Sequence, residues 1–178
     1  MMRMILLIIG VLFASKVSAQ QKIGHVNVES IFLAMPEAKN AQVNFEAFSK
    51  SKSDEIDKMQ REYQTKYDNA VSKNKTLNDS NRDVVSKELE GMSIELESLK
   101  MRIEDAVKKA QEEVTRKQGE LFTPVNTKFM TALKSVYKEK ALNYVFSASG
   151  REGDGNLLLW DNGLDITEDV KVKLGILK

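Results

Sequence analysis

The chain of 178 residues has no cysteine, one histidine, one tryptophan and two prolines. Without cysteine it can form neither a disulfide framework nor a thiol-linked lipid anchor. A single histidine also argues against a structural metal site, because such sites combine several histidine and cysteine ligands. We therefore expect no metal and no cofactor, and we expect packing or association between chains to supply stability.

The longest apolar run lies at the N-terminus, in MMRMILLIIGVLFASKVSA at residues 1–19. This segment has an early arginine, an apolar stretch from Met4 to Ala14, and small residues at Val17 and Ala19. The stretch is too short to span a bilayer, and its flanks fit a secretory signal peptide. We predict cleavage after Ala19 and export of residues 20–178. An uncleaved membrane anchor is the alternative.

The sequence also lacks an excess of charge of one sign. It has 27 lysines and arginines against 26 acidic residues, and the predicted signal peptide accounts for Arg3 and Lys16. The mature chain then has a net charge of −1, with both signs mixed along its length. Nucleic-acid-binding domains usually gather positive charge on one face, so this composition argues against a nucleic-acid partner.

A regular apolar spacing occupies the second half of the chain. The apolar residues alternate steps of four and three, at Val85, Leu89, Met92, Leu96, Leu99, Ile103, Ala106 and Ala110. This spacing predicts the apolar seam of a coiled coil.

The preceding segment has a less regular seam. Its apolar members are Phe45, Ile56, Met59, Tyr63, Ala70 and Leu77, and lysines take other places, at Lys52, Lys66 and Lys73. Lysines there can keep their stems on the seam and their ammonium groups in water. The sequence NDSNRD at 78–83 is rich in residues that form turns and helix caps. We predict an antiparallel hairpin with its tip near 78–83, in which the residue numbers of seam partners sum to 158 or 159.

We assign residues 36–140 to this helical arm and predict a bend or break near Pro124, because proline removes a helical hydrogen bond. Some apolar residues of the arm lie off the seam: Tyr67, Val71, Ile94 and Met101. They fit scattered surface hydrophobic residues and, equally, a weak and distributed contact surface for apolar clients. We take these four residues as the candidate client contacts.

The two ends of the mature chain, residues 20–35 and 141–178, predict a small body. Residues 22–32 read as a strand entering a helix, and residues 143–149 and 156–160 read as two strands joined by a glycine-rich loop. Thr167 is the predicted N-cap of a last short helix that stops at Gly175. The candidate body and oligomerisation residues are Val26, Val28, Val145, Phe146, Leu158, Trp160 and Ile166.

With 54 residues, this body is small for an independent core, so we expect sister copies to complete it. The predicted fold class is α+β: a small β-rich association body and a long antiparallel coiled-coil hairpin. His25 reads as an ordinary strand residue that faces solvent or the edge of the body.

These features together resemble the Skp/OmpH family of periplasmic chaperones. The resemblance rests on KIGHVNVESIFLAMPEA after a signal peptide, on the helical arm, and on NYVFSASG followed by LLLWDNGLDITEDVKVKL. It implies a homotrimer in which three bodies form a β-barrel-like hub and three arms surround a cavity. It further implies an ATP-independent periplasmic holdase whose partners are unfolded outer-membrane proteins.

One departure concerns charge. Well-known members of this family are strongly basic, whereas the mature chain is near neutral, so we expect enclosure and apolar contact rather than attraction to anionic membranes. A rival hypothesis makes the same helices a structural spacer or adaptor of the cell envelope that binds one folded partner. An enzyme fits worst, because the sequence has no nucleophile motif.

Overall fold

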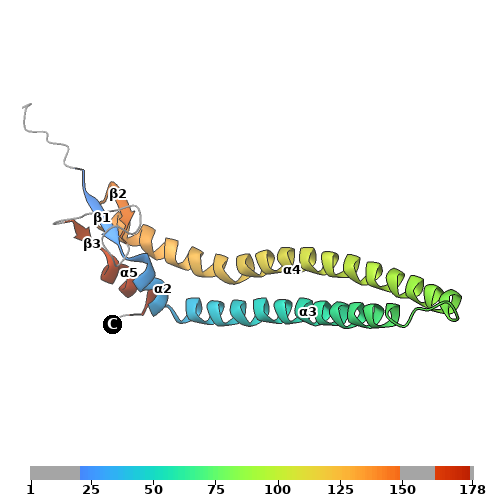
Figure 1. Cartoon of the computed structure of the whole chain (residues 1–178). Coiled ribbons are helices and arrows are strands. Elements are labelled where there is room, and N and C mark those ends of the chain that lie inside the picture. The colour runs from blue at the N-terminus through green and yellow to red at the C-terminus, as the bar shows by residue number, and fades with distance from the viewer. Residues whose placement is uncertain (1–20, 149–162, 177–178) are drawn as a thin grey trace, which may run out of the picture. The chain divides into compact units, whose positions relative to one another are not determined.

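The computed structural model describes residues 21–148 and 163–176 (Figure 1). The elements along the chain are β1 (Ile23–Val26), α2 (Val28–Ala34), α3 (Pro36–Asn74), α4 (Arg82–Glu139), β2 (Tyr144–Ser147), β3 (Leu164–Asp165) and α5 (Thr167–Leu174). The predicted signal peptide, the glycine-rich loop and the strand with Leu158 and Trp160 lie outside the described residues.

The chain divides into two compact units. We call Pro36–Thr127 the hairpin unit, and the described residues before Pro36 and after Thr127 the body unit. The sequence placed this second division at residue 140. It lies earlier because the last turns of α4 belong to the core of the body: Phe129 and Val136 are buried, and the Phe129 ring packs edge-on against Phe32 with centroids 5.3 Å apart.

A parallel three-stranded sheet joins the two ends of the chain in the body unit. β1 is the central strand, with β2 on one side and β3 on the other. Because β1 is central, His25 is only 7% exposed, with its Nε2 atom 4.0 Å from the Asp165 carboxylate. The sequence predicted that His25 faces solvent or the edge of the body, and this prediction is wrong. The core of the unit includes Val26, Ile31, Val136, Ile166, Val170 and Leu174.

Hydrogen bonds at the corner between β3 and α5 also connect the chain ends. The backbone N–H and the hydroxyl of Thr167 donate to the Asp165 carboxylate, at 2.8 and 2.5 Å. The same hydroxyl accepts from the N–H of Asn27 at 2.9 Å, and the Asn27 side chain caps α2 through the N–H of Ser30. Thr167 is therefore not the predicted N-cap, because α5 begins at Thr167 and its hydroxyl serves this link.

The sequence predicted a bend or a break near Pro124, and of these two the break does not occur, because α4 is helical without interruption through Pro124. Proline removes the N–H that would bind the carbonyl of Glu120. Both Pro124 and Glu120 are exposed, which lets water take the place of that donor.

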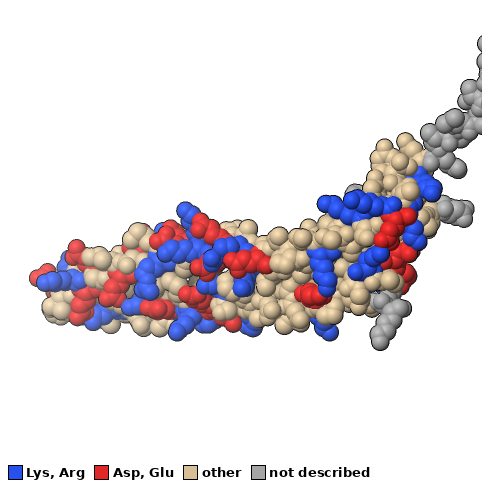
Figure 2. Space-filling view, turned by 180° about the vertical axis from the view of Figure 1, so that it is seen from behind, with Lys and Arg blue, Asp and Glu red and all other residues tan. Residues whose placement is uncertain are grey.

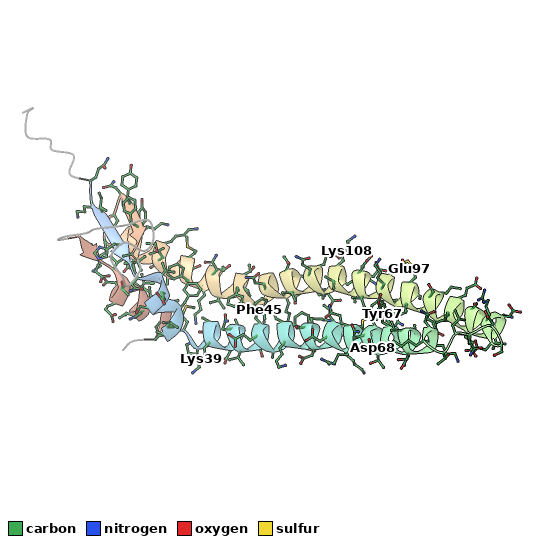
Figure 3. All side chains as sticks on the ribbon, in the orientation of Figure 1. Lys39, Phe45, Tyr67, Asp68, Glu97 and Lys108 are labelled. Atoms are coloured by element: carbon green, nitrogen blue, oxygen red, sulfur yellow. The ribbon has the colours of Figure 1, made fainter. Side chains whose placement is uncertain are left out.

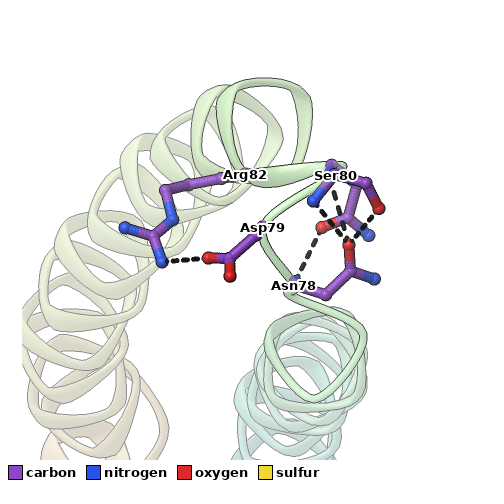
Figure 4. Close-up of polar contacts among 5 residues, drawn as sticks. Asn78, Asp79, Ser80 and Arg82 are labelled. Atoms are coloured by element: carbon purple, nitrogen blue, oxygen red, sulfur yellow. Dashed lines mark hydrogen bonds and ion pairs between the residues drawn. The ribbon is translucent and has the colours of Figure 1, made fainter.

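Residues 75–81 link α3 to α4 through local hydrogen bonds (Figure 4). The side-chain oxygen of Asn78 accepts from the N–H and hydroxyl of Ser80, at 3.0 and 2.6 Å, and the oxygen of Asn81 accepts from the N–H of Asn78 at 2.8 Å. Asp79 pairs with Arg82 at 2.7 Å. This link overlaps the predicted tip, and its side chains satisfy backbone groups that lack helical partners.

Gly24 in β1 provides a test of the packing between the chain ends. An added methyl group would lie 2.9 Å from Leu142 Cδ1 and 3.3 Å from the carbonyl oxygen of Leu164. We expect Gly24→Ala to lower the free energy of unfolding by about 1–3 kcal/mol, the usual cost of overpacking. Gly119→Ala is the control: nothing lies within 4 Å of its added methyl group in α4, and it should raise stability by about 1 kcal/mol. Urea unfolding followed by circular dichroism measures both. A Gly24→Ala protein as stable as the wild type would contradict this packing.

Candidate functional site: the surface of the helical hairpin

The seam of the hairpin agrees closely with the predicted spacing. All eight predicted seam residues of α4 are buried or half-buried, and every other residue from Val85 to Ala110 is exposed. On α3 the half-buried positions between Lys52 and Lys73 also alternate steps of four and three, and the three lysines are among them. Leu77 is the exception: it is exposed and lies in the link after α3.

The three seam lysines of α3 pair with glutamates of α4. Lys52 lies 2.6 Å from Glu113, Lys66 lies 2.8 Å from Glu95, and Lys73 pairs with Glu88. The sequence pattern predicted the seam positions of these lysines, but their ammonium groups were expected to contact water rather than glutamates. A signal for two partners was present, since Glu88 and Glu95 are seven residues apart, as Lys66 and Lys73 are.

The observed register differs from the predicted one. The ion pairs Lys66–Glu95 and Lys73–Glu88 have residue numbers that sum to 161, and the pair Lys52–Glu113 has a sum of 165. Farther from the link, Phe45 packs edge-on against Phe122 with centroids 5.9 Å apart, at a sum of 167. Charged side chains reach along the helix axis, which accounts for small offsets. The larger sums follow the end of the regular α4 seam at Ala110.

The ion pairs shift the pKa values of their members. The hydrogen bond with Glu95 raises the pKa of Lys66, and the same bond lowers the pKa of the Glu95 carboxyl group. The hydrogen bond between Lys52 and Glu113 likewise raises the pKa of the lysine and lowers that of the glutamate. All four groups are substantially in contact with water, so salt weakens these interactions.

A groove of about 370 Å³ lies along the seam between α3 and α4. Ile56 and Met59 line it from α3, and Ala106 and Ala110 line it from α4. The small alanines leave the space between the helices incompletely filled. Charged residues make up the rest of its lining, at Lys52, Glu55, Arg102, Asp105, Lys109 and Glu113. A mostly charged lining differs from the apolar walls of typical small-molecule sites.

The four candidate client contacts are all exposed, between 37% and 67%. They occupy two separate faces. Tyr67 and Val71 are one helical turn apart beside the α3 seam, and the Tyr67 ring stacks on Tyr63 with centroids 6.5 Å apart. Ile94 and Met101 are spaced seven residues apart in series with Lys108, which points away from α3 in Figure 3. Other apolar residues of the hairpin unit are also exposed but were not among the predicted client contacts, for example Val43, Val84 and Val107.

Charge is mixed over the surface. Figure 2 shows acidic and basic residues interspersed on the face that it draws, without a large area of one sign. In the parts of the chain that the structure covers, no cluster of three or more possible metal ligands occurs. None of the described helices is long and apolar enough to cross a membrane.

The body candidates fall into different classes of exposure. Val26 and Ile166 are buried within the single chain, and Val28 and Val145 are half-buried. Phe146 is exposed and stacks on Tyr144 with centroids 6.5 Å apart. By strand alternation Tyr144 and Phe146 share one face of the sheet, together with Ile23, which pairs with Tyr144 and is also exposed.

Comparison with known proteins gives one family. The family model described as outer membrane protein (OmpH-like) matches residues 22–174, which include both units. No curated protein matches the chain.

The lowered pKa values of Glu95 and Glu113 predict that the hairpin loses stability in acid. A carboxyl group whose folded pKa lies below its ordinary value of 4.5 contributes stability above that pH and loses it as the pH falls through the folded pKa. The pKa values of Lys52 and Lys66 are raised, so these lysines set a limit at alkaline pH. Their contribution to the stability of the hairpin is present below pH 10.5 and is lost as the pH rises through the raised pKa values.

The measurement is the midpoint of thermal unfolding at low salt, followed by circular dichroism. It should stay level at neutral pH and fall between about pH 5 and about pH 3. Glu95→Gln with Glu113→Gln should reduce that fall, and Glu90→Gln with Glu97→Gln, at exposed positions off the seam, is the control. An equal fall in both double variants would show that other carboxyl groups dominate.

Proposed function

The chain belongs to the OmpH-like outer membrane protein family, and from this premise we propose that it is an ATP-independent periplasmic holdase that keeps unfolded outer-membrane proteins from aggregating. The observation that carries the proposal is the family match across residues 22–174. We also propose that residues 1–19 are a signal peptide that is cleaved during export, and that the mature chain works as a homotrimer.

The surface of the hairpin suits weak and distributed contacts. Its exposed apolar residues, such as Tyr67, Ile94 and Met101, are separated by charged residues and do not line a deep apolar pocket. Burial of apolar surface contributes only about 25 cal/mol per Å². One such residue therefore holds a client weakly, and several contacts made at once raise the total affinity. Weak contacts also permit release without a nucleotide.

Apolar contact is the better candidate for the attraction between hairpin and client. The mature chain is near neutral, and its acidic and basic residues are interspersed (Figure 2). Such a surface has no strong field to steer a charged partner. We therefore propose no role for attraction to anionic membranes.

The exposed side chains on one face of the sheet are the proposed contact between copies. His25, which lies on that face by strand alternation, is buried. Ile23, Tyr144 and Phe146 are exposed in the single chain, and burying aromatic side chains is a typical source of association energy. Val26 and Ile166 are already buried in the chain's own core. Their contribution to association is indirect, through the shape of the sheet.

Replacing the client contacts tests the proposal at the level of residues. We expect Tyr67→Ser, Val71→Ser, Ile94→Ser and Met101→Ser together to weaken the affinity for an unfolded porin about tenfold, a loss of about 1.4 kcal/mol. The measurements are light scattering after dilution of the porin from urea, and the affinity at two salt concentrations. Gln60→Ser with Glu97→Ser, at exposed polar positions, is the control and should act like the wild type. A steep loss of wild-type affinity with moderate salt would contradict apolar capture.

The mass of the purified mature protein in solution tests the assembly. We expect a trimer alone and a soluble complex of one trimer with one client after addition of a urea-unfolded porin. A holdase should also suppress the aggregation of several unrelated β-barrel proteins. A monomer that ignores unfolded clients would refute the proposal, and binding of a single folded partner would favour the spacer or adaptor hypothesis.

A further inference from the structure

We propose that Lys52, Lys66 and Lys73 are specificity residues that confine helix pairing to α3 and α4 of the same chain, so that the hairpins of neighbouring copies do not merge. The inference rests on the proposed function, because an unfolded client needs the hairpins to remain separate. The three lysines are not among the proposed client contacts, so their role can be tested separately from client binding.

The lysines occupy places where an apolar residue would be more stabilising. They fall in the regular four-and-three spacing of the α3 seam, and their side chains are only 26% to 40% exposed. Polar residues in a coiled-coil seam lower stability but select the register and the number of helices that associate. The glutamate partners are 39% to 64% exposed, and ion pairs in such contact with water contribute little to stability. A role in choosing the partner helix explains the lysines better than a role in strengthening the hairpin.

Only α4 in its observed orientation supplies the opposite charge at all three places. Glu113, Glu95 and Glu88 follow one another along α4 in the reverse order of Lys52, Lys66 and Lys73 along α3. The pairing is therefore antiparallel, and each lysine meets one glutamate of α4. A shift of α3 along α4 by one seam position would separate these charges.

Pairing between the α3 helices of two copies lacks this compensation. In a parallel α3–α3 pair, each seam lysine would lie beside the same lysine of the other chain. The residues that directly follow the three lysines are Ser53, Tyr67 and Asn74, none of which is acidic. Glu55 of α3 lies 3.7 Å from Lys52 and offsets that charge in part. Lys66 and Lys73 would meet the same lysines of the other chain without the glutamates of α4, which disfavours this association.

The α4 helix has no such discrimination of its own. Its seam from Val85 to Ala110 consists only of apolar residues, so it could pair with α4 of another copy. That exchange would leave the three lysines of α3 without their glutamates. The link at 75–81, with its local hydrogen bonds around Asn78, favours reversal within one chain over exchange of α3 between chains.

The absence of cysteine allows a direct test in the full-length mature protein. Ala70→Cys places one thiol on the α3 seam, where a disulfide between chains forms only if two α3 helices meet. We expect little disulfide dimer in this background. Adding Lys52→Leu, Lys66→Leu and Lys73→Leu should increase the dimer several-fold and increase the mass of the assembly at high protein concentration. The control is Lys58→Leu, Lys75→Leu and Lys87→Leu, which changes charge and apolarity equally at exposed positions outside the seam.

A folded seam-leucine variant that cross-links no more than this control would overturn the inference. If the seam-leucine variant does not fold, charge exchange at one pair decides the question. Lys66→Glu, which opposes Glu95, should lower the unfolding midpoint, and Lys66→Glu with Glu95→Lys should restore it. Cross-linking of the double variant should stay low, because like charges would still meet at residue 66 of two α3 helices. Failure of the double variant to restore the midpoint, or a rise in its cross-linking, would also overturn the inference. A wild-type protein that does not hold clients would refute the proposed function without changing any of these outcomes.

Discussion

The pairing of β1 with both β2 and β3 is the constraint on which the rest of the structure depends. It brings residues from the two ends of the described chain into one parallel sheet. The hydrogen bonds of Thr167, which donates to Asp165 and accepts from the N–H of Asn27, reinforce the junction. Since β1 and β2 lie in one unit, the residues between them must reverse direction. The link at residues 75–81 reverses the chain between α3 and α4. Ion pairs between these two helices show that they lie antiparallel, as a hairpin.

The hairpin combines an apolar seam with charged residues placed inside it. The α4 seam contributes only apolar side chains, whereas α3 contributes lysines whose charges are balanced by Glu88, Glu95 and Glu113. The lysines bury less apolar surface than apolar residues would, but they define which helix pairs with α3 and in which direction. In a protein proposed to hold unfolded chains, self-contained hairpins leave their outer surfaces available. The weak apolar contacts proposed for the client lie on those surfaces.

The parts of the structure that could be predicted depend on short sequence separations. The four-and-three spacing from Val85 to Ala110 identified the α4 seam, and the polar run at 78–83 identified the reversal. The exposure of Tyr67 on α3 and of Ile94 on α4 followed from their positions outside the seams of these helices. Predictions that needed a distant partner were less successful. The burial of His25 depends on the strands that flank β1, and the ion pair of Lys52 depends on a glutamate far along the chain.

The sequence by itself determined the helical hairpin, its turn and the division of its residues into seam and surface, because the period of the helix relates each residue to its near neighbours. The tertiary structure alone decided the parallel sheet, the inclusion of Phe129 in the body and the pairing of Lys52 with Glu113. These features arise from contacts between residues far apart in the chain. The continuity of α4 through Pro124 depends instead on the exposure of Glu120 and Pro124 to water. Local periodicity contains no information about which distant side chain, or which water-exposed carbonyl, completes such a contact.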